Sequence, residues 1–215
     1  MIAAYLDKHR SEIEARIRQE MIKFVAVSDY SVIWKEYEKK AIAEFKLALC
    51  NGLPVLQNEA FEEGEAGRDK NRAADLLVNH AAEKVLVSVK ACRDEKKSEN
   101  DLGTLRSYAK KKATHTAMFE IWIVYDQITP TSVTQVYFDR AYKFVGRRRD
   151  ERFLSYRKKD GNLRPKPWIM FRQQESFWNT LEEFEAAMER TVLIRFVDNA
   201  ARTEVPESRQ SSPAS

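Results

Sequence analysis

Two charged side chains stand at the ends of neighbouring apolar segments in the middle of the chain. Asp75 lies near the start of residues 74–78, and Lys90 closes residues 84–90, fifteen positions further on. If both segments are strands, side chains alternate between the two faces, so Ser88 and Lys90 share a face. Burying either charge alone would be costly. We therefore expect the strands to pair and to bring Asp75 and Lys90 to a cleft at one edge of a sheet.

The elements that position these residues follow from the apolar pattern. Ile13, Ile17, Met21 and Phe24 recur at helical spacing, which predicts an N-terminal helix with one apolar stripe. The rest of the pattern predicts a helix at 32–50 ended by Asn51-Gly52, strands at 53–57, 74–78 and 84–90, a helix at 100–113, strands at 119–125 and 134–145, and a closing helix at 176–191. This order predicts an α/β (α+β) fold, in which helices flank a mixed central sheet.

Several of these features occur in the order of a known family. A helix that bears Glu38 and ends in glycine is followed by the strand with Asp75, the strand that ends at Lys90, and a further helix. In this order, residues 34–126 resemble the PD-(D/E)XK nuclease superfamily, which has the restriction-endonuclease-like fold. The resemblance implies that Asp75 holds Mg²⁺, for which Mn²⁺ can substitute, and that Lys90 orients or activates the attacking water. It also implies that Glu38, or Glu44 in a shifted helix register, is a supporting carboxylate.

One position departs from the pattern of the superfamily. Ser88 stands two residues before Lys90, where the superfamily has Asp or Glu. Some members with serine there bring the missing carboxylate from the next helix. The resemblance then implies that Glu99 is the second Mg²⁺ ligand, because it lies at or near the start of that helix, with Asp101 as the second choice and Glu95 as a further candidate. If none of them reaches the metal, the fold is kept and the activity is impaired or lost.

A strongly basic segment follows the predicted site. Residues 140–172 contain twelve Lys or Arg and three acidic residues, a net charge of +9, which leaves −5 for the rest of a chain whose total is +4. Such asymmetry suits binding to phosphates, and interleaved aromatic side chains could stack on bases or belong to the core. We expect the following residues to contact the DNA backbone: Arg147, Arg148, Arg149, Arg157, Lys158, Lys159, Lys110 and Lys111.

Composition excludes several other classes of protein. Hydrophobic residues make up 43% of the 215 residues and charged residues 33%, a globular balance without an apolar run of the roughly 20 residues that a bilayer span needs. Two cysteines and three scattered histidines do not form a zinc motif, and no Gly-rich phosphate loop occurs. The first ten residues lack the features of a secretory signal, so we expect a cytoplasmic protein.

These features together predict a Mg²⁺-dependent DNA endonuclease of the restriction or phage-defence type. We expect residues 1–30 to form an N-terminal helix that serves in dimerisation, residues 31–199 a nuclease-like domain, and residues 200–215 a disordered tail. We further expect a homodimer that does not bind membranes, and a protein partner could confer specificity. The alternatives are a catalytically degenerate nucleic-acid-binding or complex-assembly protein of the same fold, and a subunit whose basic segment contacts an acidic protein.

Overall fold

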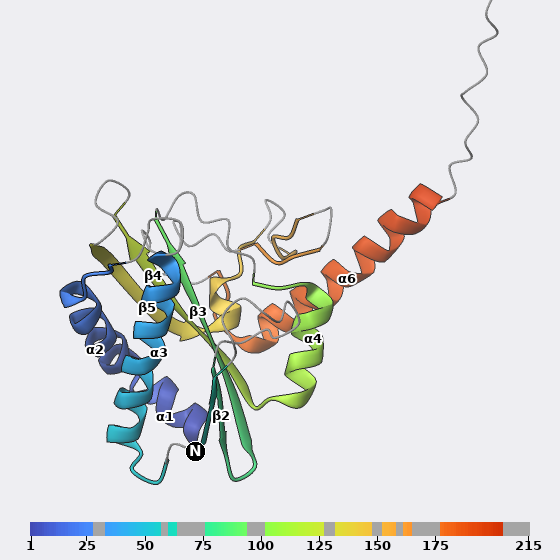
Figure 1. Ribbon diagram of the computed structural model, residues 1–215. Helices are drawn as coiled ribbons and strands as arrows, with labels where there is room; N and C mark the ends of the chain where they lie inside the picture. The colour runs from blue at the N-terminus through green and yellow to red at the C-terminus, as the bar shows by residue number, and fades with distance from the viewer. Residues whose placement is uncertain are drawn as a thin grey trace, which may run out of the picture.

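A five-stranded sheet with helices on both faces forms the protein (Figure 1). The computed structural model describes residues 1–27, 33–56, 60–63, 76–93, 102–126, 132–147, 152–157, 161–164 and 177–203, the side chains of the last helix as far as residue 194. The elements are α1 (Ile2–Lys8), α2 (Arg10–Lys23), α3 (Ile33–Gly52), β1 (Phe61–Glu63), β2 (Leu76–His80), β3 (Glu83–Cys92), α4 (Leu105–Thr114), β4 (Ala117–Tyr125), β5 (Val133–Arg140), the 3-10 helix η2 (Ala141–Phe144) and α6 (Leu181–Thr203).

The sheet is mixed, as the sequence predicts. Its strands are ordered β1-β2-β3-β4-β5, and β3 runs parallel to β4 while every other neighbouring pair is antiparallel. The parallel pair requires a crossover connection, and α4 lies within it. Strands β3 and β4 are nearly continuous apolar runs because helices cover both of their faces.

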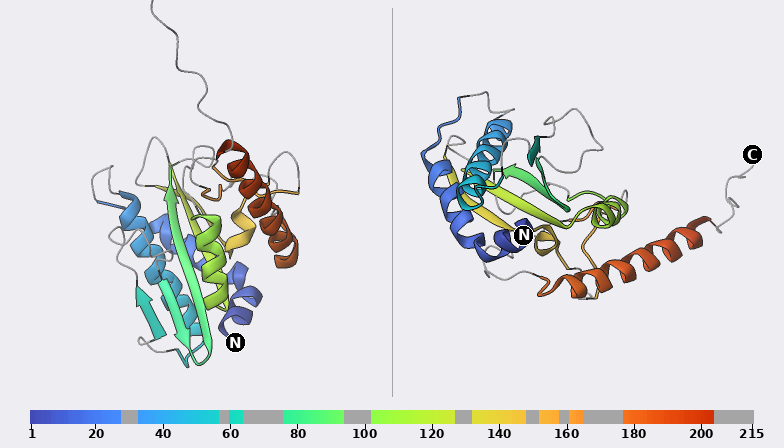
Figure 2. Two further views of the ribbon diagram at one scale, coloured as in Figure 1. Left: turned by 90° about the vertical axis from the view of Figure 1, so that its right-hand side faces the viewer. Right: turned by 90° about the horizontal axis from the view of Figure 1, so that it is seen from below.

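The two faces of the sheet have separate apolar cores. Val85, Val87 and Val89 of β3 belong to the core under α1, α2 and α3, whereas Cys92 of β3 and Trp122 of β4 belong to the core under α4 and α6. Figure 2 shows these two helical layers on either side of the sheet. Because side chains alternate along a strand, Ser88 and Lys90 share the α4 face with Cys92.

The N-terminal helices pack onto the protein's own sheet. Ile13, Ile17 and Met21 are at most 3% exposed, and α2 lies against β5 and α3. The chain breaks at His9, so the predicted single helix consists of α1 and α2. The apolar stripe is therefore buried within the monomer, and the dimerisation role of residues 1–30 stays a prediction.

The prediction of a first strand at 53–57 is wrong. Residues 53–56 form a turn at the end of α3, in which the Leu56 N–H donates to the Leu53 carbonyl over 2.9 Å. Pro54 has no N–H for a strand ladder, and the side chain of Leu56 is buried in the core from this turn. The first strand that the structure describes is instead β1, Phe61–Glu63.

Two boundaries differ from those we expected. The hairpin between β2 and β3 turns at Ala81 and Ala82 rather than at Asn79-His80, because Asn79 is paired in the ladder and Ala81 takes the positive φ of 52°. The closing helix starts at Leu181, after Thr180 accepts a hydrogen bond from the Glu183 N–H, and continues to Thr203. It therefore passes the expected end at 191 and the expected start of the tail at 200.

The predicted strand at 134–145 is divided between two elements. Strand β5 ends at Arg140, and η2 follows it and buries Phe144. Among the described helices, none combines the length and the apolar character needed to cross a bilayer.

Candidate functional site

One end of the sheet gathers the elements that carry the predicted site residues. Strands β3 and β4 finish together there, with Cys92 opposite Val124. The first described residue of β2, Leu76, is paired with Val87, five residues before that end of β3. The first turns of α3 also lie there, because the ring of Tyr37 is 5.1 Å from that of Tyr125, the last residue of β4. The fold thus brings the first turns of α3 and the ends of β3 and β4 to a common edge.

Lys90 lies near this end of β3, opposite Trp122 of β4. Its side chain is half-buried, on the face of the sheet that α4 covers. Ser88, two residues earlier, points to the same face and is 7% exposed. Long lysine side chains commonly cover apolar surface with their stems and keep the ammonium group in water.

Asp75 immediately precedes the first described residue of β2. It lies outside the described residues, as do the candidate carboxylates Glu95, Glu99 and Asp101. Leu76 is paired with Val87, and consecutive Cα atoms are about 3.8 Å apart. Asp75 is therefore known here only as the residue that precedes the Leu76–Val87 pair in sequence.

Glu38 lies in the second turn of α3 and is 9% exposed. Burial raises the pKa of its neighbour Tyr37 to about 12, so this phenol is protonated at neutral pH and cannot act as a base there. Helix α3 covers the face of the sheet opposite to that of Lys90. The two predicted residues thus reach the same end of the sheet from opposite faces. Glu44 is instead paired with Lys40 over 2.6 Å, two turns further along α3.

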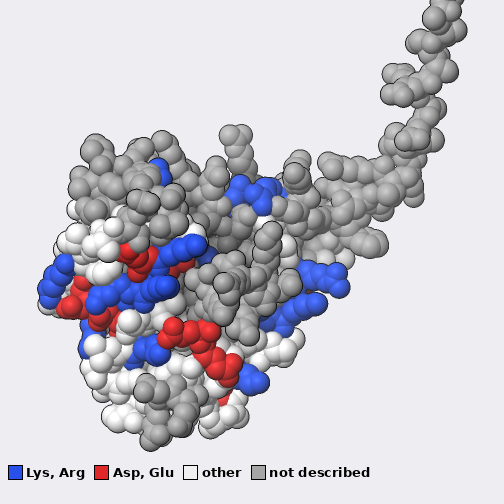
Figure 3. Space-filling model, viewed as in Figure 1, with Lys and Arg blue, Asp and Glu red and all other residues white. Residues whose placement is uncertain are grey.

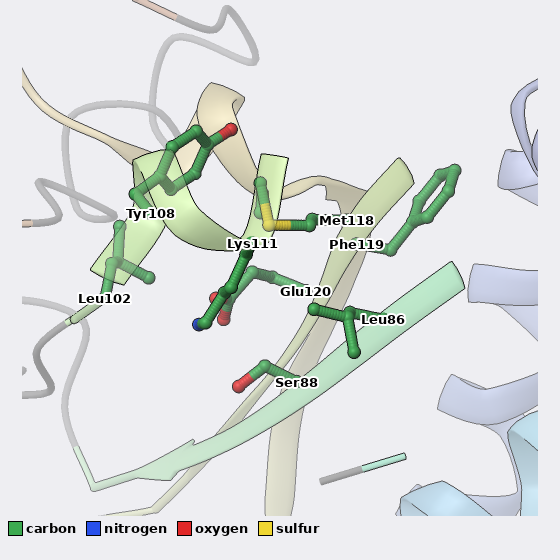
Figure 4. A pocket seen from close by; sticks show the side chains of 9 residues that line it. Leu86, Ser88, Leu102, Tyr108, Lys111, Met118, Phe119 and Glu120 are labelled. Carbon is green, nitrogen blue, oxygen red and sulfur yellow. The ribbon is translucent and has the colours of Figure 1, made fainter. Parts of the chain in front are cut away.

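A buried glutamate that the sequence analysis missed lies beside Ser88. Glu120 of β4 is directly opposite Ser88 in the parallel ladder and is 5% exposed. Both residues line a cavity of about 20 Å³ together with Leu86, Tyr108 and Lys111 (Figure 4). The sequence does contain a signal for Glu120, because it is the single acidic residue of the apolar segment 119–125.

The basic segment is less available to phosphates than its composition predicts. Arg140 donates from Nε to Asp7 over 2.7 Å, and Lys143 pairs with Asp139 over 3.3 Å. Arg147 pairs with Glu183 and donates to the Phe177 carbonyl. Asp7 and Glu183 from other elements, and Asp139 just before the segment, thus pair with charges that the local count leaves unopposed, and the contact of Arg147 with DNA stays a prediction.

Helix α4 carries an exposed basic face. Arg106, Lys110 and Lys112 are exposed, whereas Lys111 is turned inward and lines the cavity. In Figure 3, Lys and Arg side chains gather near α4, while basic and acidic side chains are mixed over α2 and α3. Lys110 thus lies on the exposed face of α4, whereas Lys111 faces the cavity, and their contacts with DNA stay predictions. Arg106 was not predicted from the sequence, although its spacing of four residues from Lys110 places both on one face of a helix.

The remaining predicted contacts are only partly described. The side chain of Arg157 is half-buried, and its carbonyl accepts from the Gly161 N–H over 2.8 Å. Arg148, Arg149, Lys158 and Lys159 lie outside the described residues. Within the described part of the chain, no three Cys, His, Asp or Glu side chains are grouped as metal ligands. Both predicted Mg²⁺ ligands, Asp75 and Glu99, lie outside that part.

Comparison with known proteins identifies the fold. No family model matches the chain, and no curated protein matches it. Among solved structures, the NlaIV restriction endonuclease is similar, with a TM-score of 0.52 and 16% sequence identity over 86% of this chain and 78% of that one. The mixed five-stranded sheet with flanking helices is thus a restriction-endonuclease-like fold of the α+β class, which confirms the predicted fold class.

Proposed function

We propose that the protein is a metal-dependent nuclease that hydrolyses phosphodiester bonds within DNA, in a restriction or phage-defence role. The observation that carries the proposal is the convergence at one end of the sheet. Lys90 of β3 and the helix turn of Glu38 lie toward that end on opposite faces of the sheet, and Leu76, the residue after Asp75, is paired with Val87 of β3. The similarity to the NlaIV restriction endonuclease, whose printed name states an endonuclease, supports this choice.

In this proposal each residue has a defined task. Asp75 supplies a carboxylate ligand to a divalent cation, and Glu99 supplies the second carboxylate that position 88 lacks. Lys90 places an ammonium charge beside the phosphate, where negative charge grows during attack. Glu38 holds a buried negative charge on the opposite face of the same end and orients the cationic groups of the site.

The carboxylates that we propose as ligands suit a hard cation. Carboxylate and hydroxyl oxygens are the ligands that Mg²⁺ and Mn²⁺ prefer, and Mg²⁺ is commonly held by one or two carboxylates with waters. A bound divalent ion would supply Lewis acidity toward the phosphate and a lowered pKa of water. Lys90 and the carboxylates would hold the phosphate and water in line for the reaction.

The exposed face of α4 supports binding of DNA. Arg106 and Lys110 are one helix turn apart and exposed, which allows contact with successive phosphates. We include Arg148, Arg149, Arg157, Lys158 and Lys159 as further contacts on the strength of the sequence. Cleavage of both strands requires two sites, so we also propose a homodimer, and a partner protein would confer specificity.

A second candidate function is favoured by one observation. Ser88 stands in place of an acid, and loss of a metal carboxylate would leave a nucleic-acid-binding or complex-assembly protein of the same fold. This protein would retain the basic face of α4 and bind DNA without cutting it. Only catalytic turnover therefore distinguishes the nuclease from the non-cleaving protein, because both would bind DNA.

Incubation of the purified chain with supercoiled plasmid and Mg²⁺ or Mn²⁺ tests the proposal. We expect nicked and linear products that disappear with EDTA. Lys90→Met should reduce the cleavage rate by about 10²–10³-fold, because a charge stabiliser of the transition state is lost. It should keep the wild-type circular dichroism spectrum and DNA affinity. Wild-type cleavage by this variant, or binding without cleavage by the wild type under all metals tried, would reject the nuclease.

A further inference from the structure

Two short segments of the basic region, residues 154–157 and 161–164, pair beside the start of α4 (Figure 1). Tyr156 and Leu163 form an antiparallel bridge between them. The hydrogen bonds on either side of this bridge, both 2.8 Å long, run from the N–H of Arg157 to the carbonyl of Asn162 and from the N–H of Arg164 to the carbonyl of Ser155. We call these two segments the ribbon. Its pairing fixes which of its side chains share a face.

The inner face of the ribbon is anchored in the core. Leu154 and Leu163 are 0% exposed and belong to the core under α4 and α6. The Leu154 N–H donates to the buried Thr191 hydroxyl of α6 over 3.0 Å. The Leu163 N–H donates over 2.8 Å to the carbonyl of Gly103, which precedes α4. Side chains that are mounted on a support fixed in this way keep their positions, as a recognition surface requires.

The outer face of the ribbon carries side chains of the kinds that read bases. Side chains alternate along a strand, so four half-buried residues share the face away from the core: Ser155, Arg157, Asn162 and Arg164. In the major groove, Arg pairs with guanine and Asn with adenine through two hydrogen bonds each, and Ser can pair with more than one base. Residues two apart on a strand are separated by about 6.8 Å, which is close to two base-pair steps of about 3.4 Å each.

This face lies next to the surface that we propose for the DNA backbone. Thr104, the N-cap of α4, forms a bridge with Asn162 of the ribbon. Arg106 follows Thr104 by two residues and is exposed on α4. A duplex held by phosphate contacts on α4 would therefore pass the ribbon. Phosphate contacts position a protein on DNA, whereas base contacts specify the sequence.

We infer that the ribbon reads base edges of duplex DNA in the major groove, with Arg157 and Arg164 on guanines and Asn162 on an adenine. The inference rests on the proposed function, and it assigns sequence specificity to this chain instead of a partner protein. It also gives Arg157 a base contact instead of a phosphate contact. Lysine can replace an arginine that touches only a phosphate, because both carry one positive charge. A guanine contact needs the planar fork of the guanidinium group.

Selection of bound duplexes from a library with a randomised segment tests the inference. The full-length protein is used with EDTA, so that no DNA is cut. The wild type should enrich a defined motif. Arg157→Lys and Arg164→Lys should each lose the preference for one G·C pair and bind the motif about tenfold or more weakly, while their affinity for a scrambled duplex stays within about twofold of the wild type. Asn162→Ala should lose the preference for one A·T pair.

Arg152→Lys is the matched control for these variants. Arg152 is exposed and precedes the ribbon, and its carbonyl accepts from Arg190 over 3.2 Å. This variant should select the wild-type motif with wild-type affinity. Circular dichroism identifies the folded variants, and the three substitutions on the ribbon test the same face independently. Equal losses of affinity for the motif and for the scrambled duplex in every folded variant would overturn the inference, as would selection of the unchanged motif by all of them.

The plasmid cleavage assay separates this inference from the proposed function. If the wild type cleaves plasmid but enriches no motif, the inference fails and the nuclease proposal stands. If the wild type enriches a motif that depends on Arg157 and Arg164 but cleaves no plasmid with any metal, the inference stands and the nuclease proposal fails. If the wild type neither enriches a motif nor cleaves plasmid, both fail.

Discussion

The guanidinium carbon of Arg147 lies 4.3 Å from the centroid of the Trp178 ring, and the same side chain pairs with Glu183 of α6. Trp178 in turn donates from its indole nitrogen to the Val145 carbonyl over 2.7 Å and is 1% exposed. Arg147 therefore joins the segment after η2 to the start of α6. A residue that its sequence context marks as a phosphate ligand has a structural role.

This role predicts a loss of stability in Arg147→Met. The variant should lower the free energy of unfolding by about 1–2 kcal/mol, as a cation–π contact and a partly exposed ion pair are removed. Urea denaturation measures the change. Lys143→Met is the matched control, since Lys143 pairs with Asp139 over 3.3 Å. It should cost less than about 0.5 kcal/mol. Reduced DNA affinity with unchanged stability in Arg147→Met would contradict this role.

The partner of Arg147 predicts a pH dependence. Burial opposes ionisation of Glu183, but hydrogen bonds from the Asn179 N–H, from Arg147 and at Thr180 outweigh it and lower its pKa below the ordinary 4.5. A lowered folded-state pKa means that the stabilisation is complete above pH 4.5 and is lost as the pH falls through the folded value. The stability difference between the wild type and Glu183→Gln should therefore be largest near neutral pH and shrink below pH 4.5.

Urea titrations between pH 3 and 7 measure this difference. In the Arg147→Met background, the pH-dependent part of this difference in the free energy of unfolding should become smaller, because one of the groups that lower the pKa of Glu183 is absent. A difference that stays constant over this range, or grows toward low pH, would show that Glu183 does not stabilise the fold through its charge.

Glu38 is expected to affect cleavage more than the neighbouring buried acid on α3. Glu38→Gln should lower kcat/KM on plasmid DNA by about 10–100-fold, the size typical of residues that position a metal site. Glu44→Gln is the matched control, because Glu44 lies two turns away and is paired with Lys40. Single-turnover kinetics with Mg²⁺ provide the comparison. Equal activity of the two variants would remove Glu38 from the site.

The basic face of α4 predicts a defined salt dependence. Arg106→Ala and Lys110→Ala should each lower the slope of log affinity against log salt concentration by about 0.9, the value for one phosphate contact on duplex DNA. Lys112→Ala on the same helix should leave the slope unchanged, since Lys112 is paired with Glu185 over 2.6 Å. Fluorescence anisotropy at several salt concentrations, without metal, measures the slopes. Equal slopes for all four proteins would place the DNA elsewhere.

The spacing of apolar residues was sufficient to predict the helices and strands with a strong hydrophobic periodicity. The continuous apolar runs at 84–90 and 119–125 fall within β3 and β4, and the helical spacing at 32–50 corresponds to α3. The run at 53–57 misled because a proline-containing apolar segment can bury Leu56 from a turn as well as from a strand. A short segment has too few positions to distinguish the strand period of about 2 residues from the helical period of about 3.6 residues.

The sequence by itself determined the fold class, helix α3, the central strands β3 and β4, and the place of Lys90 near the end of β3. Only the tertiary structure placed Glu120 beside Ser88, because strand register between residues 32 positions apart is set by packing over the whole sheet. The tertiary structure also pairs three side chains of the basic segment with acidic residues of other elements: Arg140, Lys143 and Arg147. Charge counts along the chain describe neighbours in sequence, whereas the electrostatic field depends on neighbours in space.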